Sequence, residues 1–138
     1  MATLELPAEV YDAVVAHARE GAPEEVCGVL GGRREAGTCR VSRAERVPNV
    51  ASTPETRYQL DPGDQLAAMR AVEDADGEVV GFYHSHPRGP RRPSATDEAQ
   101  ATWPDASYVI VSLDGTAPFV GSWRWTGERF EEEAVRVD

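Results

Sequence analysis

Three side chains that can bind a metal ion lie close together in the sequence, at His84, His86 and Asp97. Residues 79–85 are apolar and rich in β-branched and aromatic side chains, which predicts a buried strand with His84 near its end. Side chains two residues apart lie on the same face of a strand, so the two imidazoles should point the same way. With an Asp97 oxygen they would form a His/His/Asp set that leaves a fourth position for water, as in a catalytic zinc site.

The same residues also have a simpler interpretation. Two histidines at the end of a strand are more often ordinary polar residues than ligands, because short motifs produce false matches. Ser94 and Asp97 have the spacing of a helix N-cap and its partner three residues later, so Asp97 could serve only to start a short helix over 94–103. The two interpretations are compatible, since a capped helix would hold the Asp97 carboxylate still.

The spacing His84-x-His86, seven residues, Ser94-x-x-Asp97 resembles the JAMM (MPN-plus) motif of the Mov34/PAD-1 metalloproteases. The metal-binding segment carries the specificity of this match. The resemblance implies an α/β (α+β) fold of the MPN/JAMM, cytidine-deaminase-like kind, in which helices flank a mixed β-sheet.

That family is similar in a second place, a Glu-x-Cys-Gly-like segment upstream of the histidines. Here residues 25–28 read Glu-Val-Cys-Gly, and further similarity at 48–50 and 57–62 extends the resemblance over nearly the whole chain. The family pattern implies that Glu25 is the general base, with Glu24 as the competing assignment.

The resemblance also implies the chemistry of the site. The two histidines and the aspartate would hold one Zn²⁺, which would acidify a bound water and polarise a carbonyl group. Ser94 would donate a hydrogen bond to the oxyanion that forms during peptide hydrolysis.

Members of this family cleave the isopeptide or peptide bond after the C-terminal Gly-Gly of ubiquitin-like proteins. We therefore expect a zinc metallopeptidase of the archaeal and bacterial single-domain branch. Its partner would be a small ubiquitin-like modifier or a sulfur-carrier protein and its conjugates. The alternatives are a peptidase that frees cysteine from a sulfur carrier and a metal-free MPN scaffold that only binds partners. A zinc nucleoside deaminase is disfavoured, because its His-x-Glu and Pro-Cys-x-x-Cys pattern is missing.

Three arginines, Arg88, Arg91 and Arg92, occupy a proline-rich loop between the histidines and Ser94. In an acidic chain they could bind substrate, either by steering an acidic partner or by gripping a carboxylate. The alternative is a solvated loop whose positive charge offsets local repulsion.

Composition narrows the class of protein. The chain has 138 residues, enough for one domain over 1–138, and a net charge of −10, and all of its basic residues are arginine. Such an acidic surface repels nucleic acid, and no apolar run is long enough to span a membrane. We expect a cytoplasmic protein whose two cysteines, Cys27 and Cys39, are reduced because they lie too far apart in the predicted hairpin to form a disulfide.

The remaining sequence predicts the elements that must position the site. A helix over 8–20 follows a short strand, and a second helix begins at Asp61-Pro62 with Leu66, Met69 and Val72 as its buried stripe. Strands are expected, from hydrophobic pattern and turn residues, at 3–6, 25–34, 41–47, 57–60, 79–85, 108–111, 118–125 and 129–137.

Overall fold

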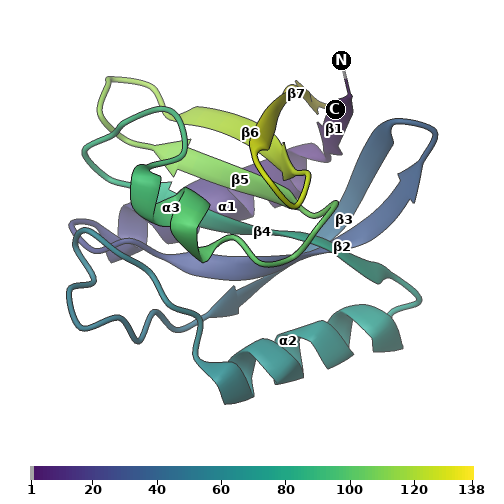
Figure 1. The fold of residues 1–138 in the computed structure, drawn as a ribbon, viewed down its shortest axis with the longest axis horizontal. Coiled ribbons are helices and arrows are strands. Elements are labelled where there is room, and N and C mark those ends of the chain that lie inside the picture. The colour runs from purple at the N-terminus through teal and green to yellow at the C-terminus, as the bar shows by residue number, and fades with distance from the viewer. Residues whose placement is uncertain (1) are drawn as a thin grey trace.

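A seven-stranded sheet and three helices make up residues 2–138, the part of the chain that the computed structural model describes (Figure 1). The elements follow the order β1 (Thr3–Leu6), α1 (Ala8–Gly21), β2 (Cys27–Glu35), β3 (Thr38–Val47), α2 (Pro62–Asp74), β4 (Glu78–His86), α3 (Ala95–Gln100), β5 (Ser107–Ser112), β6 (Phe119–Trp125) and β7 (Phe130–Val137).

The strands pair in the order β1-β3-β2-β4-β5-β6-β7. β1 pairs in parallel with both β3 and β7, so this short strand closes the sheet into a barrel. β4 and β5 are also parallel, and the other neighbouring strands are antiparallel. The predicted mixed sheet flanked by helices is therefore confirmed.

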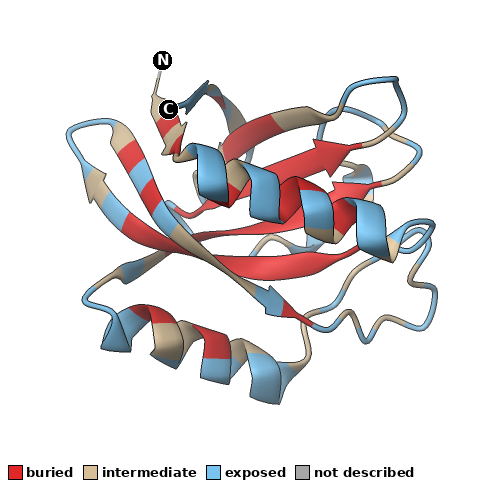
Figure 2. Cartoon of the chain, turned by 180° about the vertical axis from the view of Figure 1, so that it is seen from behind, coloured by how far each residue is buried: buried red, intermediate tan, exposed pale blue. Residues whose placement is uncertain are grey.

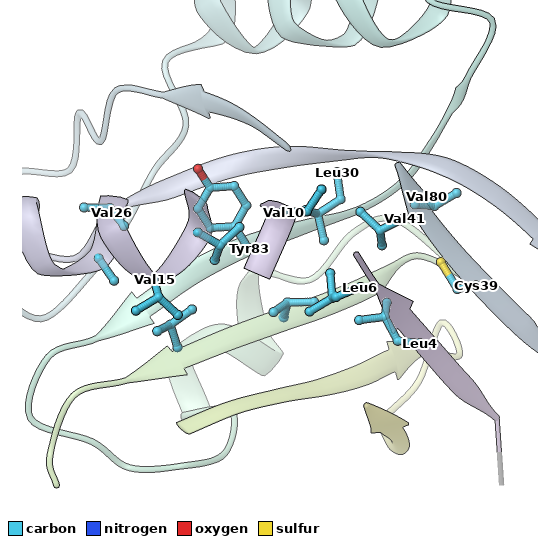
Figure 3. Packing of buried hydrophobic residues seen from close by; sticks show 14 residues of the cluster. Leu4, Leu6, Val10, Val15, Val26, Leu30, Cys39, Val41, Val80 and Tyr83 are labelled. Atoms are coloured by element: carbon cyan, nitrogen blue, oxygen red, sulfur yellow. The ribbon is translucent and has the colours of Figure 1, made fainter. Parts of the chain in front are cut away.

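Helices cover both faces of the sheet, and each face has its own apolar cluster. α1 contributes Val14 to the cluster drawn in Figure 3, which also contains Tyr83 of β4. α2 contributes Val72 to a second cluster, which contains Phe82 of β4. Seen from behind, α1 crosses the sheet and the buried residues are concentrated in the strands beneath it (Figure 2). Since side chains alternate along a strand, His84 lies on the Phe82 face.

The start of α2 and the turn between β2 and β3 are explained by the residues at those positions. Asp61 caps α2, because its carboxylate accepts a hydrogen bond of 2.9 Å from the Asp64 backbone N–H. The β2–β3 hairpin turns at Ala36 and Gly37, which both have positive φ angles (45° and 83°). Cys27 pairs with Val47 at the far end of this hairpin, and both cysteines are buried and free, as predicted.

Three sequence predictions are wrong in detail. Residues 57–60 are not a strand: only a single bridge joins Asn49 and Leu60 there. Leu66 does not face the core and is 49% exposed, because α2 packs through Ala68 and Leu66 lies about 200° around the helix from it. The helix expected over 94–103 ends at Gln100.

None of the helices in residues 2–138 is both long enough and apolar enough to cross a membrane.

Candidate metal centre

The two histidines lie at the end of β4. β4 is hydrogen-bonded to β2 on one side and β5 on the other, so its backbone is fixed along both edges. His84 and His86 are 1% and 3% exposed, and both point to the same face of the sheet. Their Nε2 atoms are 3.1 Å apart. The strand alternation predicted from the sequence therefore produces a converging pair of imidazoles.

Asp97 joins this pair from the first turn of α3. Its Oδ2 atom lies 3.2 Å from His84 Nε2 and 3.1 Å from His86 Nε2. The same oxygen accepts a hydrogen bond of 2.8 Å from the Ser94 backbone N–H, while Ser94 Oγ accepts one of 3.0 Å from the Asp97 N–H. Helix capping and contact with the histidines thus occur together, and the cap sets the direction of the carboxylate.

The spacing of the three atoms fits a bound cation. Tetrahedral zinc with nitrogen and oxygen ligands at about 2.0–2.1 Å requires its ligand atoms to be about 3.3 Å apart. The Nε2, Nε2 and Oδ2 atoms form a triangle with sides of 3.1–3.2 Å. A cation at this point could accept the lone pairs of both Nε2 atoms and would also lie beside the Asp97 carboxylate.

Different neighbours hold the two rings. His86 Nδ1 donates a hydrogen bond of 2.8 Å to the carbonyl of Pro90, which leaves its Nε2 lone pair for a metal. His84 is stacked on the ring of Tyr58, with centroids 4.2 Å apart and planes inclined by 20°. His84 Nδ1 is buried and has no hydrogen-bond partner in the described residues, so the aromatic stack fixes this ring.

Glu25 completes the group, and Glu24 does not. Glu25 is 7% exposed, and one of its carboxylate oxygens lies within 4.8 Å of ligand nitrogens on both histidines. Its backbone N–H donates to the Pro54 carbonyl (2.7 Å), which anchors the segment before β2. Glu24 is exposed to solvent. Of the two glutamates, only Glu25 therefore lies beside the histidine pair.

Burial and mutual contact shift the ionisation of the group. Burial raises the pKa of Glu25 to about 7, although the neighbouring His86 acts in the opposite direction. Burial would also raise the pKa of Asp97, but the contacts of its carboxylate with His84 and His86 outweigh it, and the pKa is lowered. Burial lowers the pKa of His84, which favours the neutral imidazole that a metal requires. Asp97 is thus ionised, while Glu25 can exchange a proton near neutral pH.

Two cavities flank this group. One has a volume of about 390 Å³ and is lined by Pro23, Glu25, Glu55, Thr56, His86, Pro87, Arg88, Gly89, Pro90 and Ser94. The other has a volume of about 230 Å³ and an aromatic floor, and is lined by Tyr58, Gln59, Leu60, Gln65, Phe82, Gln100, Thr102, Trp103 and Tyr108. The larger cavity thus reaches Glu25 and His86 directly, whereas the smaller one adjoins the group through Tyr58, whose ring stacks on His84.

The three arginines of the loop after β4 do not share one environment. Arg88 is exposed and lines the larger cavity. Arg91 pairs with Asp114, with a distance of 2.9 Å from Nε to Oδ1, and its guanidinium lies over the ring of Phe119. Arg92 is exposed and is not among the residues that line either cavity described above.

Sequence reasoning missed Tyr58 and the Pro90 carbonyl. Both belong to irregular segments, in which no periodicity indicates where a side chain or a carbonyl will point. The similarity around 57–62 marked the region of Tyr58, but gave no signal that its ring stacks on His84.

The fold and the site together are those of a JAB/MPN-type metallohydrolase. The family model "Prokaryotic homologs of the JAB domain" matches residues 7–126, and the chain therefore belongs to this family. The resemblance to the JAMM proteins is confirmed.

Known relatives match nearly the whole chain. A desampylase from Haloferax volcanii is 45% identical over 139 residues, which is 98% of this chain and 96% of the relative. A CysO-cysteine peptidase from Mycobacterium bovis is 43% identical over 135 residues, covering 97% and 90%. The solution structure of a protein from Desulfitobacterium hafniense superposes with a TM-score of 0.87 at 34% identity, covering 100% of this chain and 93% of that one.

Replacing Asp97 and Ser94 separates capping from metal binding. Each of Asp97→Ala and Ser94→Ala removes one half of the capping box of α3 and should lower the free energy of unfolding by about 1 kcal/mol. Only Asp97→Ala also removes a carboxylate from the histidine pair. We expect Ser94→Ala to keep about one zinc per chain and Asp97→Ala to lose most of it after dialysis, measured by elemental mass spectrometry. Full zinc content in Asp97→Ala would contradict this arrangement.

Proposed function

We propose that this protein is a zinc-dependent peptidase that cleaves after the C-terminal Gly-Gly of a ubiquitin-like modifier or sulfur-carrier protein. The main support for this function is the triangle of His84 Nε2, His86 Nε2 and Asp97 Oδ2, which has the Glu25 carboxylate beside it. We propose these three as the ligands of one Zn²⁺. Zinc bound there would supply a Lewis acid and lower the pKa of a coordinated water to about 7.

The residues of the chain would supply the rest of the chemistry. Glu25, with a pKa raised to about 7 by burial, would take a proton from the attacking water and pass it to the leaving amine. Ser94 Oγ accepts a hydrogen bond from the Asp97 N–H, so its own hydroxyl proton is free to donate to the developing oxyanion. Ser94 and Glu25 line the same cavity, which gives both access to one scissile bond.

The names of the relatives support the substrate class. A desampylase and a CysO-cysteine peptidase match this chain over 97–98% of its length. We propose that the whole chain, residues 1–138, forms one catalytic domain. Its cytoplasmic location, expected from the sequence, stays a prediction.

Activity should depend on Glu25 and on metal. The substrates would be a ubiquitin-like sulfur-carrier protein ending in Gly-Gly, joined either to cysteine or to the ε-amine of a lysine peptide. Glu25→Gln should lower kcat by about 10²–10⁴ with zinc content unchanged, because it removes the general base but leaves the proposed ligands. Glu24→Gln is the matched control and should stay within about twofold of wild type, since Glu24 is exposed.

A chelator should abolish cleavage of both substrates, and added Zn²⁺ should restore it. The proposal fails if Glu25→Gln keeps full activity or if the chelated protein cleaves as fast as the zinc-loaded one. Zinc binding without cleavage of either conjugate would indicate the alternative of a scaffold that only binds its partners.

Arg88 is the arginine that we propose for substrate binding. It lines the cavity shared with Glu25 and Ser94, whereas Arg91 is already paired with Asp114. A guanidinium in this position suits the free α-carboxylate of an amino acid linked to the Gly-Gly terminus.

This role can be tested with two Gly-Gly-cysteine substrates that differ only in a free or amidated C-terminal carboxyl group. Arg88→Ala should lower kcat/KM for the free acid by about 10–100-fold, the usual effect of losing one charged hydrogen bond. It should leave the amide within about threefold of wild type, and Arg92→Ala should change neither. Equal losses on both substrates would assign Arg88 to a role other than carboxylate recognition.

A further inference from the structure

The orientation of His86 depends on the loop that follows it. His86 is the last residue of β4, and its Nδ1 donates to the Pro90 carbonyl (2.8 Å) four residues later. The Gly89 backbone N–H in turn donates to the His86 carbonyl (3.0 Å). His84, by contrast, lies within the strand and is held by the Tyr58 ring. His86 therefore keeps its Nε2 lone pair on the proposed metal only while Pro90 stays in place.

Asp114 contacts the loop on both sides of Pro90. Its Oδ1 accepts hydrogen bonds from Arg91 Nε (2.9 Å) and from Ser112 Oγ (3.0 Å). On the other side, a Cβ added to Gly89 would lie 3.2 Å from Asp114 Oδ2, so the glycine backbone rests close to this carboxylate. Asp114 lies two residues beyond the end of β5, the parallel neighbour of β4. Asp114, just beyond the end of the adjacent strand and bonded to Ser112 within it, thus contacts the loop that holds His86.

Arg91 is confined in the same way. Its guanidinium carbon lies 5.5 Å from the centroid of the Phe119 ring at the start of β6. The side chains of Arg91 and Asp114 are nevertheless 51% and 34% exposed. Exposed ion pairs contribute little to folding stability. A pair placed here can therefore influence the site without being needed for the fold.

We propose that Arg91 and Asp114 are positioning residues, which hold the Pro90 carbonyl against His86 and so orient one ligand of the metal. This inference rests on the proposed metal site but not on any substrate. It also assigns Arg91 a different role from the substrate contact that the sequence suggested. The atoms involved run in an unbroken chain from Ser112 through Asp114, Arg91 and Pro90 to His86.

The test is a set of four variants: Arg91→Ala, Asp114→Ala, their double mutant, and Arg92→Ala as the control from the same loop. Zinc affinity would be measured by competition with a chromogenic chelator. We expect each single variant and the double mutant to bind zinc about 10–100-fold more weakly, the usual effect of losing an outer-shell contact to a ligand. Because the two residues act as a unit, the double mutant should be no weaker than the worse single variant. Arg92→Ala should bind as wild type does.

A second readout follows His86 itself. In zinc-loaded wild type, the Pro90 carbonyl should protect the Nδ1–H of His86 from exchange with solvent, and NMR should show faster exchange of this proton in Arg91→Ala and Asp114→Ala. Asp114→Asn keeps an acceptor oxygen for Arg91 and should restore most of the zinc affinity, whereas a purely electrostatic role would not survive this change.

Unchanged zinc affinity together with unchanged exchange of the His86 Nδ1–H in Arg91→Ala would overturn the proposal. Equal weakening in Arg92→Ala would also overturn it, because the effect would then follow the charge of the loop. Neither measurement uses a substrate, so a failure of the proposed peptidase activity would be recognised separately, as zinc binding without cleavage.

Discussion

One carboxylate oxygen connects the fold to the site. Asp97 Oδ2 accepts the Ser94 backbone N–H at the start of α3 and also lies 3.1–3.2 Å from the Nε2 atoms of both histidines. The carboxylate cannot rotate to favour one of these contacts without losing the other, so the beginning of α3 and the centre of the site are fixed together. A charged oxygen buried to this extent needs such partners, since an unpaired one would be costly.

A second constraint comes from β4, whose side chains pack on both faces of the sheet. Phe82 and His84 face α2 and the site, while Tyr83 between them belongs to the cluster under α1 and contacts His17 (2.7 Å from Tyr83 hydroxyl to His17 Nδ1). Gly28 on β2 has no side chain because the Tyr83 ring occupies that space: a Cβ there would lie 2.2 Å from the ring. The packing that fixes Tyr83 on one face therefore fixes the histidines on the other.

Regular structure is what made the site predictable from the sequence. His84 and His86 share a face because strands alternate, and Asp97 is placed by a cap whose spacing is visible in the residue types. Glu25 could not be separated from Glu24 in this way, because the segment before β2 is irregular. The exposure of Leu66 depends on which side of α2 meets the sheet, and the confinement of Arg91 depends on Asp114, 23 residues away. Such contacts are set by tertiary packing, and the residue pattern of a single segment does not show how that segment packs against distant ones.

The proposed site requires two imidazoles and one carboxylate to converge on a single cation and leave a position for water. X-ray absorption at the zinc edge, on wild-type protein loaded with one equivalent of zinc, measures this directly. We expect two imidazole ligands and two oxygen ligands at about 2.0–2.1 Å, and no sulfur at about 2.3 Å even though Cys27 is paired with His84 across the sheet. A sulfur ligand, or fewer than two imidazoles, would contradict it.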